Sequence, residues 1–85
     1  MKHASASTVA ILEPWLNKLR TVEGLHERRP GVFYFKGRAF VHFHEGNGEI
    51  AADIRCDEEF DRFDITRVKE RDHFFRLILR VVKTK

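Results

Sequence analysis

The sequence predicts an α+β fold, a two-layer sandwich in which two helices cover one face of an antiparallel sheet of three to four strands. Residues 9–22 and 67–83 carry apolar side chains three and four positions apart, as a helix with one buried face requires. Between them, residues 32–55 are rich in aromatic and β-branched residues and alternate apolar with polar positions, as half-buried strands do. Because both helices must bury their apolar stripes, one sheet face is their expected partner.

Length and composition favour one small domain. A chain of 85 residues closes a single hydrophobic core, and 42% hydrophobic with 34% charged residues is typical of a globular protein. Residues 1–7 are small and polar, so we predict a flexible N-terminal tail there and a single domain over residues 8–85.

Charge and cysteine content narrow the function classes only slightly. The net charge of +3 assists contact with an anionic partner without requiring one. The single cysteine, Cys56, cannot form an intramolecular disulfide, and we see neither a signal peptide nor a membrane-spanning segment. We therefore expect a cytoplasmic protein that has no contact with a membrane, with Cys56 as a small buried residue.

The first helix is well marked along its length, but its start is ambiguous. Its stripe consists of Val9, Leu12, Trp15, Leu16, Leu19 and Val22. Pro14 marks the first turn or kinks a longer helix, because it lacks the N–H of an interior position. Gly24 is a natural stop, and residues 25–31 are predicted as a polar connector to the strand at residues 32–35.

The turn at residues 36–38 has two alternatives. A two-residue turn leaves Phe33 and Phe35 on the face opposite Val41, whereas a three-residue turn, or a strand that continues through Gly37, places both rings on the Val41 face. We favour the three-residue turn, because it buries more apolar area.

The next hairpin is better determined, because Asn47-Gly48 is a strong two-residue turn signal. The predicted pairs are Gly46 with Glu49, Phe43 with Ala52, His42 with Asp53 and Val41 with Ile54. The sheet face away from the helices is then predicted to carry Arg38, Phe40, His42, His44, Asp53 and Arg55, together with Tyr34.

The last third of the chain is predicted to form a short helical turn and a long helix. Phe60 and Phe63 are three apart, which fits one helical turn, and a short strand can follow at residues 63–65. Thr66 is the expected cap of the helix at residues 67–83.

Two resemblances concern these segments. The patterns K-x-R-A-F-V-H-F-H-E, A-D-I-R and F-D-R-F-D-I resemble a group of short bacterial proteins of uncharacterised function, over about residues 31–82. That resemblance implies no catalytic residue. The predicted layout is also loosely similar to that of frataxin and YjbR-type sandwiches, in which two helices flank an antiparallel sheet.

A local resemblance concerns residues 36–43, K-G-R-A-F-V-H-F, which are similar to the octamer of RNA-recognition motifs. In that family the exposed aromatics stack on bases while alternate residues are buried. Carried over to this chain, the resemblance implies that Arg38 and Phe40 contact bases.

Candidate metal or acid/base chemistry centres on His42, His44 and Asp53. The two histidines share one face of their strand, and Asp53 lies across from His42, so two imidazoles and a carboxylate can converge. The alternative is partly exposed histidines paired with Asp53 or Glu45, which any polar strand face produces.

From these observations we favour a non-catalytic binding module that uses the open sheet face with a protein partner or as a homodimer. That surface consists of Arg38, Phe40, His42, His44, Asp53 and Arg55. Binding of single-stranded nucleic acid through residues 36–43 is one alternative, and a small metal-dependent or acid/base enzyme at His42, His44 and Asp53 is another. No cofactor is expected, because the sequence has no glycine-rich phosphate loop, CxxC pair or nucleophile elbow.

Overall fold

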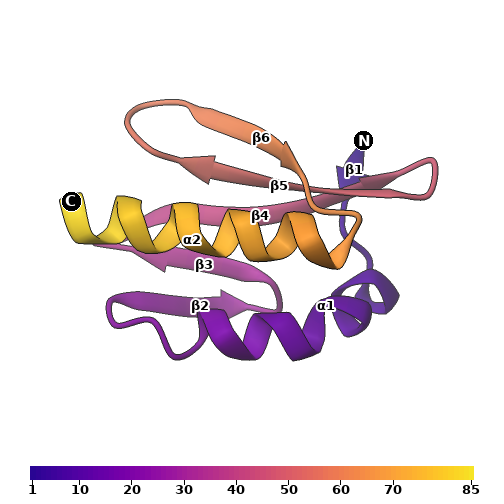
Figure 1. The fold of residues 1–85 in the computed structure, drawn as a ribbon, viewed down its shortest axis with the longest axis horizontal. Helices are drawn as coiled ribbons and strands as arrows, with labels where there is room; N and C mark the ends of the chain where they lie inside the picture. The colour runs from indigo at the N-terminus through magenta and orange to yellow at the C-terminus, as the bar shows by residue number, and fades with distance from the viewer.

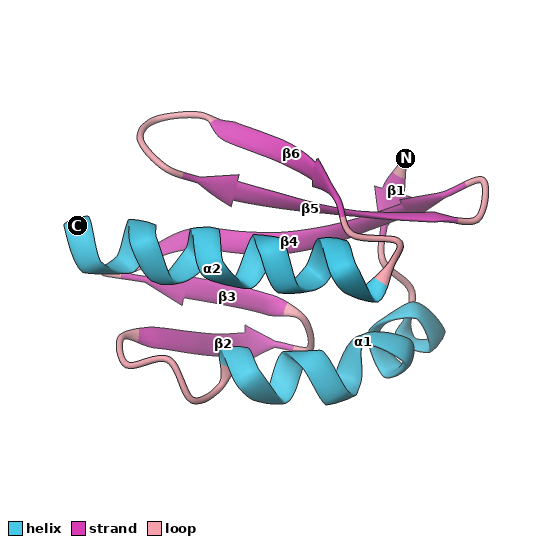
Figure 2. Ribbon diagram, in the orientation of Figure 1, coloured by secondary structure: helices cyan, strands magenta, loops and turns pink.

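A computed structural model describes all of the residues, Met1–Lys85. Two helices and six strands follow one another along the chain (Figures 1 and 2). They are β1 Lys2–His3, α1 Ala6–Leu19, β2 Leu25–Arg29, β3 Val32–Phe35, β4 Arg38–Gly46, β5 Glu49–Arg55, β6 Phe60–Asp64 and α2 Val68–Thr84. The α+β class is confirmed, and the sheet has more strands than the predicted three to four.

The sheet is antiparallel and runs in the order β2-β3-β4-β5-β6, so each of these strands pairs with its neighbour in sequence. Strand β1 pairs with the last part of β4, with Lys2 opposite Glu45 and His3 opposite His44. Residues 1–7, predicted as a flexible tail, therefore supply a strand of the sheet and the start of α1.

Helix α1 begins earlier than predicted because Ser5 caps it. The Ser5 hydroxyl accepts a hydrogen bond from the backbone N–H of Thr8, and the Ser5 N–H donates to Glu45 of β4. Pro14 consequently lies inside the helix instead of in its first turn.

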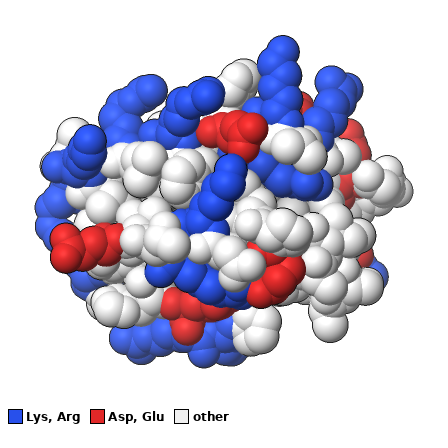
Figure 3. Space-filling model, turned by 60° about the horizontal axis from the view of Figure 1, so that its bottom comes forward, with Lys and Arg blue, Asp and Glu red and all other residues white.

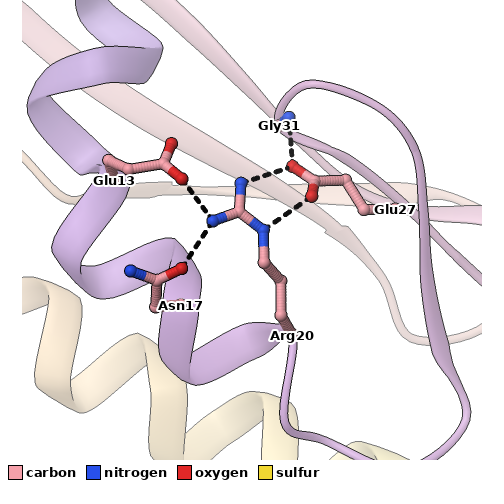
Figure 4. Close-up of polar contacts among 5 residues, drawn as sticks. All are labelled: Glu13, Asn17, Arg20, Glu27 and Gly31. Carbon is pink, nitrogen blue, oxygen red and sulfur yellow. Dashed lines mark hydrogen bonds and ion pairs between the residues drawn. The ribbon is translucent and has the colours of Figure 1, made fainter.

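Strand β2 occupies residues that were predicted as a polar connector. Its first residue, Leu25, is buried, and the remainder is exposed or half-buried because β2 is an edge of the sheet. Figure 4 shows how Arg20, which follows α1, holds this edge. The Arg20 guanidinium donates to both carboxylate oxygens of Glu27, at 2.7 and 3.0 Å, and also contacts Glu13 and Asn17 of α1.

The turn between β3 and β4 is the two-residue Lys36-Gly37 turn, so the favoured turn is wrong, although Phe33 and Phe35 do lie on the Val41 face as predicted. Both turn residues have positive φ, 54° and 80°. Tyr34 pairs with Ala39, as that turn requires.

A β-bulge at Phe40 changes which side chains of β4 point toward the helices. Phe33 pairs with Val41, so Phe40 has no partner in β3 and one extra residue enters β4. The bulge keeps Phe33 on the face of Val41 and turns Phe40 into the core. Phe40 is only 4% exposed, and its ring centre lies 5.2 Å from that of Phe35. The prediction that Phe40 lies on the open face is therefore wrong.

The β4–β5 hairpin has the predicted register, and all four predicted pairs are present. Asn47 and Gly48 form its turn with φ of 52° and 76°.

Residues 60–64 form the edge strand β6, and the predicted helical turn is wrong. In a strand, positions three apart point to opposite faces. Phe63 accordingly packs against Phe74 of α2, with ring centres 5.6 Å apart, whereas Phe60 contacts His42 on the other side of the sheet, at 4.7 Å.

The core lies between the sheet and both helices. Trp15 of α1 contacts Phe43 of β4 and Phe74 of α2, with ring centres 5.8 and 6.2 Å apart. The buried apolar cluster consists of Leu12, Trp15, Leu16, Leu19, Leu25, Phe33, Phe40, Val41, Phe43, Ala52, Ile54, Ile65, Phe74, Ile78 and Val81. Cys56 is partly buried against this cluster.

Helix α2 begins one residue after the predicted start, with Arg67 at the N-cap and the Glu70 carboxylate accepting from the Arg67 N–H at 3.0 Å. Thr66, the predicted cap, instead accepts a hydrogen bond from the N–H of Ile50 in β5. Neither helix is long and apolar enough to cross a membrane.

Candidate functional site

Three histidines meet on the sheet face opposite the helices. Strand alternation puts His42 and His44 of β4 on this face, and β1 brings His3 beside His44. The His3 and His44 ring centres are 4.7 Å apart, and those of His42 and His44 are 4.9 Å apart. One nitrogen of each ring lies within 4.8 Å of the other two. We call His3, His42 and His44 the histidine cluster.

Asp53 joins this cluster from β5. Its Oδ2 lies 3.2 Å from His44 Nε2, which is also 3.0 Å from His42 Nδ1. Arg62 of β6 donates two hydrogen bonds to the Asp53 carboxylate, at 2.9 and 3.1 Å. Asp53 and His44 are both buried, with 7% and 9% exposure, so the contacts between them are shielded from water.

The pKa values in the site favour neutral imidazoles beside an ionised carboxylate. Burial lowers the pKa of His42 and of His44, although the Asp53 charge acts in the opposite direction. Burial opposes ionisation of Asp53, but the hydrogen bonds and charge of Arg62 outweigh it, so the Asp53 pKa lies below its ordinary value. Arg62 therefore favours the ionised form of the Asp53 carboxylate, and burial disfavours the protonated forms of the His42 and His44 imidazoles.

One nitrogen of the cluster has no hydrogen-bond partner. His44 Nδ1 is buried and unpaired, as are Arg55 Nε at the edge of the site and Trp15 Nε1 in the core. An unsatisfied buried polar atom costs about 1–3 kcal/mol, so such an atom within a group of convergent polar side chains needs a physical reason.

The surroundings of the cluster are aromatic and basic. Phe60 packs on His42, and the Arg55 guanidinium lies 4.5 Å from the centre of the Phe60 ring. On the side of the cluster nearer to the β2–β3 turn, His3 and His42 line a pocket of about 340 Å³ together with Arg29 and residues of that turn.

The predicted site residues divide into two groups. His42, His44 and Asp53 lie together, and Arg55 flanks them through Phe60. Arg38 and Phe40 are separated from this group, because the bulge reverses their faces. Arg38 lines a different pocket with Phe40 and the C-terminal residue of the chain, and lies 3.7 Å from Glu58.

Three residues of the site were missed in the sequence. The sequence pattern predicts a tail at His3 and a helical turn at Phe60 and Arg62. The sequence F-D-R-F-D has no apolar–polar alternation that marks a strand, so the pairing of Arg62 with Asp53 is shown only by the structure.

The burial of Phe40 removes the stacking residue on which the RNA-binding resemblance depended. On the face shown in Figure 3, Lys and Arg side chains are interrupted by Asp and Glu and separated by uncharged surface, so this face has no continuous basic groove.

Comparisons with protein-family models, with curated proteins and with solved structures found no match. The resemblance to short bacterial proteins therefore stays a prediction, and the function is argued from the site.

Proposed function

We propose that this protein is a non-catalytic binding module whose ligand site is the histidine cluster with Asp53, on the open face of the sheet. The observation that carries the proposal is the convergence of three imidazoles and a carboxylate from three different strands, with one nitrogen of each imidazole within 4.8 Å of the other two and the Asp53 carboxylate 3.2 Å from His44 Nε2. Convergent polar groups of this kind, held at a partly enclosed surface, are the usual mark of a ligand site.

The rigidity of the site supports binding. His42 and Asp53 sit opposite each other in the most extensively paired part of the sheet, and Arg62 fixes the carboxylate from a third strand. Side chains held in place before the ligand arrives lose little conformational entropy when it binds.

The side chains in the site favour binding over catalysis. His3, His42, His44, Asp53 and Arg62 include no hydroxyl or thiol, so covalent catalysis of the serine, threonine or cysteine type is not available in the site. Cys56 packs against the core between the sheet and the helices, and burial raises the pKa of its thiol, which makes it less reactive. The lone cysteine also supports our expectation of a reducing, cytoplasmic location.

A thermal-shift screen tests this proposal. The probes are Zn²⁺, inorganic phosphate, citrate and a nucleoside monophosphate, each applied to the natural protein, to His42→Ala and to the control His26→Ala. His26 is exposed on β2, outside the cluster. A probe at a hundred times its Kd adds about 2.7 kcal/mol of stability, which is roughly 10–20 °C in Tm for a domain of this size.

We expect at least one probe to raise the Tm of the natural protein and of His26→Ala but not of His42→Ala. If no probe does so, or if the shift persists in His42→Ala, the cluster is not a ligand site.

Self-association through the open face is a second candidate. Two aromatic rings on this face are covered by guanidinium groups, Tyr34 by Arg28 and Phe60 by Arg55, each at 4.5 Å from the ring centre. Arginine and aromatic residues are enriched in protein interfaces. Light scattering at micromolar concentration tests this, since a mass that stays at one chain rules out the homodimer.

A further inference from the structure

We propose that the ligand of the histidine cluster is one divalent transition-metal ion of the zinc class, held by imidazole nitrogens of His3, His42 and His44. This inference rests on the proposed function, because it names the ligand of the same site.

The spacing of the nitrogens is close to what such an ion needs. With Zn–N bonds of about 2.0–2.1 Å in a tetrahedral arrangement, ligating nitrogens lie roughly 3.3–3.4 Å apart. His42 Nδ1 and His44 Nε2 are 3.0 Å apart. The cluster as a whole spans up to 4.8 Å, so His3 has the largest distance to close.

His3 has the freedom to close that distance. It is exposed and belongs to the two-residue strand β1, whereas the other two rings are fixed in the middle of the sheet. The site therefore consists of a rigid pair of ligands and one adjustable ligand from the N-terminal segment.

The protonation of the rings also suits a metal ion. At 3.0 Å, one of His42 Nδ1 and His44 Nε2 donates its N–H to the lone pair of the other, and once the donor ring's proton moves to its second nitrogen, both atoms can offer a lone pair to a cation.

The donor atoms select the class of ion. Imidazole suits zinc and its neighbours in the first transition row, whereas Mg²⁺ and Ca²⁺ take oxygen ligands. Three histidines leave a fourth position open, beside which Asp53 supplies a negative charge. The two hydrogen bonds from Arg62 hold that carboxylate in place, so Arg62 is a positioning residue for the site.

Zn²⁺ titration by calorimetry, with protein that carries no affinity tag, tests the proposal. Co²⁺ is the spectroscopic probe, because its visible d–d absorption distinguishes four-coordinate from six-coordinate binding. The test variant is His3→Ala, which removes an exposed side chain and should leave the core intact. The matched control is the double variant His26→Ala, His73→Ala, since both of these histidines are exposed and lie outside the cluster.

Cu²⁺ and Ni²⁺ are unsuitable probes for this protein. When Met1 carries a free amino group, that group, two backbone amides and a histidine at the third residue can form a square-planar chelate without any folded structure. Zn²⁺ and Co²⁺ avoid this ambiguity.

We expect about one Zn²⁺ per chain, a four-coordinate Co²⁺ spectrum, and an affinity at least about 100-fold lower in His3→Ala but unchanged in the double control. Zinc binding that is absent, equally tight in His3→Ala, or lost in the double control overturns the inference.

Failure of the zinc inference is distinguishable from failure of the proposed function. If Zn²⁺ does not bind, but phosphate, citrate or the nucleotide stabilises the protein in a His42-dependent manner, the cluster is a ligand site for another class of molecule. If no probe depends on His42, both proposals fail.

Discussion

The Phe40→Ala substitution tests whether the bulge in β4 turns this ring into the core. The side chain is 4% exposed and packs against Phe35 between the sheet and the end of α2. Removing a buried phenylalanine ring costs about 3–5 kcal/mol, from lost burial and from the cavity that remains. For 85 residues the total stability is about 4–13 kcal/mol, so this one change removes a large part of it.

Urea unfolding followed by circular dichroism measures this loss, and a thermal scan should show a fall in Tm of roughly 12–40 °C. The control is Ile11→Ala in α1, where the side chain is 61% exposed and the expected change is within about 0.5 kcal/mol. If Phe40→Ala is as mild as the control, the ring lies on an exposed face, and the bulge and the core assignment are both wrong.

Three further predictions follow from other parts of the structure. The Arg20 hydrogen bonds lower the pKa of Glu27, so the stability they add is present above the unfolded pKa of about 4.3 and is lost as pH falls through the lower folded value. Between about pH 6 and about pH 2, the urea concentration at the unfolding midpoint should therefore fall less in Glu27→Gln than in the natural protein. An equal fall in the two proteins would contradict this. Gly37→Ala and Gly48→Ala should each cost about 1–2 kcal/mol in urea unfolding, because φ is 80° and 76° there although a Cβ meets no atom; unchanged midpoints would show that neither turn needs glycine. Arg62→Ala should weaken Zn²⁺ binding about 10–100-fold in calorimetry while the far-ultraviolet circular dichroism is unchanged, and an unaltered Kd would remove Arg62 as a positioning residue.

The parts of the fold that were predictable from sequence are those set by local signals. Asn47-Gly48 fixes the β4–β5 hairpin, because both turn residues need positive φ and the turn length sets the register. That register places His42, His44 and Asp53 on one face, so these three residues of the candidate site were predictable from the sequence.

The bulge at Phe40 had no such signal. A two-residue turn followed by regular pairing would place Phe33 on the open face, away from the core. The extra residue in β4 avoids this, because it allows both Phe33 and Phe40 to be buried. The outcome depends on how much apolar area the two helices can cover, which is a property of the whole fold and not of residues 36–43.

His3 was unpredictable for a related reason. A strand of two residues has no periodicity, and β1 is held by long-range contacts, among them the hydrogen bond from the Ala4 N–H to the Phe43 carbonyl at 3.0 Å. Phe60 and Phe63 illustrate a different ambiguity, since a spacing of three fits one helical turn or the two faces of a strand. Pairing with β5 decides between them.

The most direct test of the site is a spectrum of the ¹⁵N-labelled imidazoles, recorded while Zn²⁺ is added. The chain has five histidines, of which His26 and His73 lie outside the cluster. We expect His3, His42 and His44 to shift together, with one nitrogen of each ring moving as its lone pair binds the ion, and the other two rings to stay unchanged until Zn²⁺ exceeds one equivalent per chain. If all five rings respond alike, or if the cluster does not respond, the histidine cluster is not a metal site.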